Sequence, residues 1–182
     1  MPALYDVPVN TIDGRAATLA DHKGKVLLIV NVASKCGLTP QYEGLEKLQK
    51  TYAAKGFSVL GFPANNFGAQ EPGTNDEIQS FCSTNYGVSF PLYEKISVRG
   101  DGMHPLYQEL VAGKPKAQMK PGGTLMETLT KHGLAPKTET EVAWNFEKFL
   151  VGRDGKVAAR FAPDYAPDDT TITKAIESEL AR

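Results

Sequence analysis

The stretch KVLLIVNVASKCGLTPQYEGLEKLQKTYAAKGFSVLGF, residues 25–62, predicts a β-strand, an α-helix and a second β-strand in immediate succession. Residues 25–33 form a mainly apolar run, which is typical of a strand covered on both faces of a sheet. We expect Thr39 to cap the helix, Pro40 to occupy its first position and Gly56 to end it. Because a helix joins the two strands, they are expected to be parallel.

The segments on either side extend this unit. Residues 5–19 predict a short β-hairpin around Asp13-Gly14, and Thr74 to Glu77 form a capping box that opens a helix to about Asn85. The other expected elements are a helix at 104–111, one or two helical turns at 125–131, a hairpin of 144–151 with 156–161, and a helix at 168–181. This order predicts an α/β thioredoxin fold, with a central mixed sheet flanked by helices and an N-terminal β-hairpin.

Length and composition narrow the class of protein. The 182 residues suit a single domain spanning 1–182, and the formal net charge of −1 disfavours a nucleic-acid partner. The longest apolar run, residues 26–30, is too short to cross a membrane, and the N-terminus does not resemble a signal peptide, so a cytoplasmic protein is expected. The histidines are scattered and no phosphate-binding glycine motif is present, so neither a metal nor a nucleotide is expected.

The chain has two cysteines, Cys36 and Cys82, too few for a structural disulfide framework. Cys36 lies between the apolar strand and the predicted helix, where unpaired backbone N–H groups and the helix dipole favour a thiolate. Lys35 would add a positive charge beside it if its side chain turns toward the sulfur, but the side chain could equally point to water. The position alone is equally consistent with a small cysteine that only packs.

Three stretches resemble the signatures of one family. They are NVASKCGLT at 31–39, GFPANNFGAQEPG at 61–73 and WNFEKFLV at 144–151. In their order and comparable spacing they are similar to the glutathione peroxidase family, and the match runs from the N-terminal hairpin to the last helix. The resemblance is nearest to bacterial members that use thioredoxin, including the type encoded with vitamin B12 transport genes. Ala64 and Asn66 depart from the Cys and Gln that are common in the second signature.

The resemblance implies a thiol peroxidase that reduces hydrogen peroxide and organic hydroperoxides. It assigns the attack on peroxide to Cys36 and places Gln70, Trp144 and Asn145 around it. Amide and indole N–H groups are neutral donors that stabilise an anion without titrating. Without the resemblance, Trp144 would be interpreted as a core residue, and Gln70 and Asn145 as loop residues that cap local backbone.

The segment FCSTNYGV, residues 81–88, resembles the segment that carries the resolving cysteine in thioredoxin-using members. The resemblance implies that Cys82 attacks the sulfenic acid of Cys36 and that thioredoxin reduces the resulting disulfide. Cys82 also lies in line with Ile78 and Phe81, on the expected inner face of its helix. If Cys82 is packed there, we expect the helix to unwind locally during turnover.

The sequence leaves three alternatives to a thioredoxin-dependent peroxidase open. Glutathione could reduce the sulfenic acid in place of Cys82, the protein could be a peroxide sensor that relays oxidation to a partner protein, or it could be a binding module without catalysis. The retained set of Cys36, Gln70, Trp144 and Asn145 argues against a binding module. No cofactor is expected beyond the thiol electron donor. Residues 112–142 fall where tetrameric family members carry an oligomerisation loop, which permits a monomer or a weak homo-oligomer.

Overall fold

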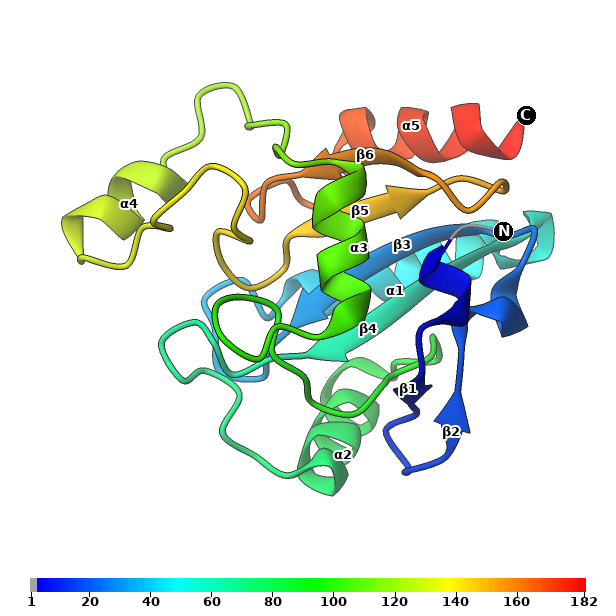
Figure 1. Cartoon of the computed structure of the whole chain (residues 1–182), viewed down its shortest axis with the longest axis horizontal. Coiled ribbons are helices and arrows are strands. Elements are labelled where there is room, and N and C mark those ends of the chain that lie inside the picture. Colours follow the sequence, from blue (N-terminus) through cyan, green and yellow to red (C-terminus); the bar gives the residue numbers. More distant parts are fainter. Residues whose placement is uncertain (1–2) are drawn as a thin grey trace.

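A four-stranded mixed sheet forms the centre of the protein in a computed structural model that describes residues 3–182 (Figure 1). The strand order is β4-β3-β5-β6. Strand β3 (Val26–Val32) runs parallel to β4 (Phe57–Pro63) and antiparallel to β5 (Lys148–Val151), which pairs with β6 (Val157–Phe161). Every residue of β3 is buried, as its mainly apolar sequence predicts. The predicted β-α-β unit and mixed sheet are confirmed.

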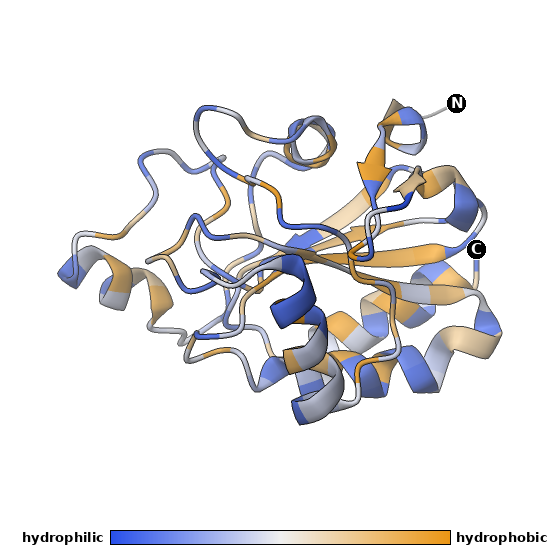
Figure 2. Ribbon diagram, turned by 90° about the horizontal axis from the view of Figure 1, so that it is seen from below, coloured by the Kyte–Doolittle hydropathy of each residue, from blue (hydrophilic) through white to orange (hydrophobic). Residues whose placement is uncertain are grey.

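Helices cover both faces of this sheet. Helix α1 (Gln41–Tyr52), helix α2 (Asn75–Tyr86) and helix α5 (Thr170–Leu180) contribute to one apolar core, and α3 (Pro105–Gly113) contributes to the other (Figure 1). The coloured ribbon shows apolar strands between helices that are polar on their outer sides (Figure 2). No helix among residues 3–182 is long and apolar enough to cross a membrane.

The alternation of side chains along β3 divides the interior into these two cores. Leu28 and Val30 pack in the core with α1 and α5, whereas Leu27 and Ile29 pack in the core with α3. Successive side chains of a strand point to opposite faces, so a fully apolar strand needs cover on both sides. Strand β3 therefore holds the two layers together.

The ends of several elements differ from the sequence prediction. The N-terminal hairpin consists of β1 (Val9–Asn10) and β2 (Ala16–Ala17), while Tyr5 lies in a 3-10 helix, η1 (Ala3–Asp6), rather than in a strand. A second 3-10 helix, η2 (Leu19–His22), follows β2. The short strands reflect a hairpin that pairs only near its turn.

Helix α1 also begins differently from the prediction. It starts at Gln41 with Pro40 at the capping position, where no side chain caps the helix. The expected capping role of Thr39 and the expected place of Pro40 at the first helical position are therefore wrong. At its other end a 3-10 turn, η3 (Ala53–Lys55), leads to Gly56 at φ 91°, and the predicted glycine stop is confirmed. The capping box of Thr74 and Glu77 on α2 is also confirmed.

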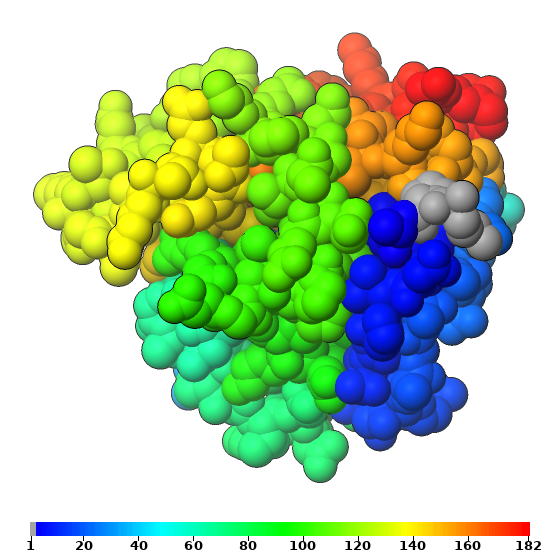
Figure 3. All heavy atoms as spheres, in the orientation of Figure 1, coloured from blue at the N-terminus to red at the C-terminus, as the bar shows by residue number. Residues whose placement is uncertain are grey.

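Residues 112–142 form an irregular segment with one short helix, α4 (Leu125–Lys131), and gather at one end of the molecule (Figure 3). Arg160 on β6 anchors both ends of this segment. Its guanidinium donates hydrogen bonds to the carbonyl oxygens of Lys114 at 2.9 Å and Thr140 at 3.0 Å. The same group forms a fully buried ion pair with Glu147, in which Arg160 Nε lies 2.6 Å from Oε2.

We expect Arg160→Met to lower the free energy of unfolding by about 3–5 kcal/mol, because it leaves the buried Glu147 carboxylate without its partner. Urea denaturation followed by circular dichroism measures the change. Arg15→Met is the matched control, since the Arg15–Asp13 pair is exposed and such pairs contribute about 0–1 kcal/mol. Equal losses in the two variants would contradict the structural role of the buried pair.

Candidate active site

Cys36 lies in a tight turn that follows β3 and precedes α1. The Leu38 N–H donates a hydrogen bond to Cys36 Sγ at 3.3 Å. Thr39 closes the turn, because its hydroxyl accepts a hydrogen bond from the Cys36 N–H at 2.9 Å and donates one to the Ala33 carbonyl at 2.8 Å. The N–H group that stabilises negative charge on sulfur thus belongs to the turn, and the helix itself begins five residues after Cys36.

Gln70 and Asn145 meet beside this turn. Asn145 is fully buried and its Nδ2 donates a hydrogen bond to Gln70 Oε1 at 2.9 Å. The Lys35 N–H donates to the Gln70 carbonyl at 3.0 Å, so the backbone next to Cys36 is tied to the Gln70 loop. Oε1 of the Gln70 side chain accepts the hydrogen bond from Asn145. The NH₂ group on the other side of the same amide is therefore available as a donor.

Trp144 forms an apolar wall of the same region. It is 7% exposed and packs on Phe67, with ring centroids 5.6 Å apart. Cys36 packs against the core cluster that contains both aromatic residues. Gly68, at φ 64°, lets the indole ring of Trp144 pack closely against the backbone, because a Cβ at this position would lie only 3.2 Å from the ring.

The segment that carries Trp144 and Asn145 is held to the end of β3 by Asn31. Asn31 Nδ2 donates to the Trp144 carbonyl at 3.0 Å, and the Phe146 N–H donates to the Asn31 carbonyl at 2.6 Å. Phe146 has φ 68°, so the predicted strand over 144–151 is wrong for its first four residues, and β5 begins at Lys148. The turn directs the Asn145 side chain toward Gln70.

The structure thus brings Gln70 and Asn145 into direct contact and places Trp144 and Cys36 on one apolar cluster. Within residues 3–182, no hydrogen bond joins Cys36 Sγ to the side chains of Gln70, Trp144 or Asn145.

Cys82 is separate from this group. It lies on α2 with no exposed surface, in the core that also holds Tyr42 and Ile78, and both cysteines are free thiols. Burial raises the pKa of the Cys82 thiol to about 11, with the Glu71 carboxylate adding to the shift and Tyr42 opposing it. The predicted packing of Cys82 on the inner face of its helix is confirmed.

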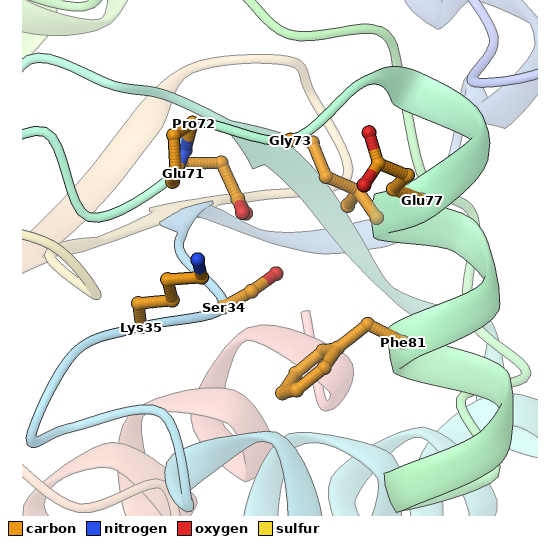
Figure 4. Close-up of a pocket in the computed structure, with 8 residues that line it drawn as sticks. Ser34, Lys35, Glu71, Pro72, Gly73, Glu77 and Phe81 are labelled. Carbon is orange, nitrogen blue, oxygen red and sulfur yellow. The ribbon is translucent and has the colours of Figure 1, made fainter.

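A cavity of about 380 Å³ separates the Cys36 turn from α2 (Figure 4). Its lining comes from the residues just before Cys36, from the loop after Gln70 and from α2: Ser34, Lys35, Glu71, Gly73, Ile78 and Phe81. The cavity therefore lies between the loop of one cysteine and the helix of the other. Among residues 3–182, no group of three or more His, Cys, Asp or Glu side chains is placed to hold a metal ion.

Sequence reasoning missed three polar residues near the site. Asn31 is a polar residue within an apolar strand, and this break in the pattern could have marked it as a site residue. Glu71 directly follows Gln70 within the second signature. Asn66 had no assigned role. Its side chain accepts a hydrogen bond from the Val98 N–H at 2.9 Å and donates one to Ser97 Oγ at 3.1 Å, so it fixes the loop before Gln70.

The family model for glutathione peroxidase matches residues 4–111. The chain belongs to the glutathione peroxidase family. It is 52% identical over 174 residues to the thioredoxin/glutathione peroxidase BtuE of Escherichia coli, covering 96% of this chain and 95% of that protein. It is 46% identical to the hydroperoxy fatty acid reductase gpx1 of Synechocystis, covering 91% and 90% of the two chains. These findings confirm the predicted family and its peroxidase class.

Solved structures agree with the fold of this glutathione peroxidase. The crystal structure of T. cruzi GPX1 matches with a TM-score of 0.69 and 34% identity, over 98% of this chain and 96% of that one. A thioredoxin-family thiol:disulfide interchange protein from Chlorobium tepidum matches with a TM-score of 0.59 at 16% identity, over 95% and 92% of the two chains, and supports the fold alone. The predicted thioredoxin fold is confirmed.

In the reduced, folded protein we expect iodoacetamide at pH 8 to modify Cys36 and to leave Cys82 unmodified. Cys36 is partly exposed, whereas Cys82 is buried and its thiol has a pKa of about 11, so it supplies almost no thiolate. Mass spectrometry of the two cysteine peptides measures the labelling, and the same reaction in urea is the control in which both should react. Equal labelling in the native protein would contradict the burial of Cys82.

Proposed function

We propose that the protein reduces hydrogen peroxide and organic hydroperoxides at Cys36. The hydrogen bond from Asn145 to Gln70, formed beside the Cys36 turn in a glutathione peroxidase, is the observation that carries the proposal. The Cys36 thiolate attacks one peroxide oxygen, an S–O bond forms and the O–O bond breaks. The departing hydroxide or alkoxide takes a proton and leaves as water or an alcohol, and Cys36 is left as a sulfenic acid.

Gln70, Trp144 and Asn145 support this step by position and charge. Asn145 orients the Gln70 amide through a hydrogen bond. The indole ring of Trp144 belongs to the apolar cluster against which Cys36 packs. Neutral N–H donors held in a fixed geometry stabilise the developing oxyanion without reorganising during the reaction. Asn145 therefore acts chiefly by holding Gln70. No cofactor is required for these steps beyond the thiol that supplies electrons.

Cys82 completes the cycle in this proposal. Its thiol attacks the sulfenic acid of Cys36, a disulfide forms and water leaves, and thioredoxin then reduces the disulfide. Two findings support this route: Cys36 packs against the core that contains Cys82, and a relative at 52% identity is named for thioredoxin as well as glutathione. Direct reduction by glutathione is the second route, because Cys36 is partly exposed.

A peroxide sensor that passes oxidation to a partner protein would use the same residues. Sustained turnover with thioredoxin separates the two functions, since a sensor has no need of rapid recycling. A hydroperoxy fatty acid reductase among the relatives supports organic hydroperoxides as substrates. The irregular segment 112–142 protrudes at one end and is compatible with a monomer or a weak homo-oligomer (Figure 3).

We expect Cys36→Ser to abolish peroxide consumption with either reductant, because serine cannot form a sulfenic acid. Cys82→Ser should lose most turnover with thioredoxin and retain turnover with glutathione if glutathione can reach Cys36. NADPH oxidation coupled through thioredoxin reductase or glutathione reductase measures both. Full activity in Cys36→Ser would overturn the peroxidase proposal, and full thioredoxin-dependent activity in Cys82→Ser would overturn the resolving role alone.

Helix α2 should open when the disulfide forms, because Cys82 is fully buried in the reduced protein. We expect hydrogen exchange in residues 78–88 to accelerate after one equivalent of peroxide in the wild type. Cys82→Ser, which stops at the sulfenic acid, should keep the protection of the reduced protein. Unchanged exchange in a wild type whose disulfide has been verified by mass would contradict the opening of α2.

A further inference from the structure

We propose that Glu71 is the base that accepts the thiol proton of Cys82 when Cys82 attacks the oxidised Cys36. The inference rests on the resolving role proposed above and adds a catalytic residue to that step. The proposal is based on a buried carboxylate that takes no part in the attack of Cys36 on peroxide.

Glu71 is buried in an unusual way. The residue is 1% exposed, and neither carboxylate oxygen has a hydrogen-bond partner or an ion-pair partner among residues 3–182. The Lys95 ammonium lies nearby but donates to backbone carbonyls, those of Glu71 at 2.9 Å and Gly73 at 2.5 Å. An unpaired buried carboxylate lowers stability, so its presence calls for a functional explanation.

The backbone of Glu71 is firmly held, which fixes the side chain in place. Its N–H donates to Asn65 Oδ1 at 2.9 Å, and its carbonyl oxygen accepts the bond from Lys95. The side chain enters the cavity between the Cys36 turn and α2, and Figure 4 shows the carboxylate directed toward Ser34. A thiol leaving α2 for Cys36 would therefore enter the cavity that Glu71 lines.

The groups around Glu71 come from four segments. They are Ser34 and Lys35 before Cys36, Tyr42 on α1, Glu77 and Cys82 on α2, and Lys95 in the loop before α3. Burial raises the pKa of the Glu71 carboxyl, while the nearby hydroxyl and N–H dipoles of Ser34 and the positive charges of Lys95 and Lys35 partly offset the shift. The raised pKa makes the Glu71 carboxylate a stronger base than an ordinary exposed carboxylate, and in its ionised form it can accept a proton.

The chemistry of resolution requires such a base. With a pKa of about 11, the Cys82 thiol is almost wholly protonated at pH 7, and a thiol is a poor nucleophile. In the proposed step the Cys82 proton moves to the Glu71 carboxylate as the sulfur attacks Cys36. The S–O bond of the sulfenic acid breaks, and its hydroxide leaves as water with a proton returned by Glu71. The products are the disulfide, water and the original carboxylate.

The test compares Glu71→Gln with Glu77→Gln. Both side chains line the same cavity, but Glu77 is exposed and lies on the N-terminal turn of α2. After mixing with peroxide, the fluorescence of Trp144, the single tryptophan, reports Cys36 oxidation. Acid quenching, alkylation and mass spectrometry then count the disulfide.

We expect Glu71→Gln to slow disulfide formation by about 100-fold or more, as loss of a general base does, while Cys36 oxidation continues near the wild-type rate. The wild-type rate of disulfide formation should fall at acidic pH as Glu71 takes up a proton, and the variant should lose this dependence. Glu71→Asp should restore part of the rate and the pH dependence. Glu77→Gln should form the disulfide as the wild type does.

Three outcomes would overturn the inference. Equal rates of disulfide formation in the wild type and Glu71→Gln would reject Glu71 as the base and leave the resolving role of Cys82 intact. Parallel slowing of Cys36 oxidation and disulfide formation would assign Glu71 a structural role. A wild type that accumulates the sulfenic acid without any disulfide would reject the resolving role of Cys82, and the inference with it.

Discussion

The hydrogen bonds of Asn31 are the constraint on which the rest of the site depends. They fix the segment carrying Trp144 and Asn145 to the end of β3, the strand that leads into the Cys36 turn. The strand order explains why this is possible. Since β3 lies between parallel β4 and antiparallel β5, the end of β3, the end of β4 and the start of β5 meet at one edge of the sheet. Three segments distant in the sequence thereby form one site.

Buried charges behind that edge hold the segment in place. Glu147 accepts a hydrogen bond from the Ala143 N–H at 2.9 Å and pairs with Arg160, which closes the turn around Trp144 from behind. Lys148 is fully buried, and its Nζ donates to Gln41 Oε1 at 2.6 Å and to the Tyr165 carbonyl at 2.6 Å. Burial lowers the pKa of Lys148 to about 7. The charged residues of the third signature, Glu147 and Lys148, therefore make this segment rigid, whereas its first two residues, Trp144 and Asn145, lie beside Cys36 and Gln70.

The sequence predicts the strands and helices well because their apolar periodicity depends only on neighbouring residues. It fails where tertiary contacts decide the outcome. Thr39 has the right chemistry for a helix cap, yet its hydroxyl bonds inside the Cys36 turn. Residues 144–147 have strand-like composition, but Asn31 draws them into a turn. The grouping of Cys36, Gln70, Trp144 and Asn145 could be inferred from the family resemblance. The place of Glu71 in the lining of a cavity shared with α2 could not, since three separate segments build that cavity.

The two cysteines differ in environment in a way that orders the reaction. In the proposed cycle peroxide meets Cys36 first, because Cys36 is partly exposed and its sulfur accepts an N–H hydrogen bond, whereas burial keeps Cys82 protonated and out of reach. The same burial would block resolution if α2 were firmly packed. Only Ile78 and Cys82 are fully buried on that helix, whereas α1 buries five residues. Because the cost of local opening follows the apolar surface exposed, opening α2 should cost less than opening α1, and in the proposed cycle the sheet stays folded while the second thiol reaches the first.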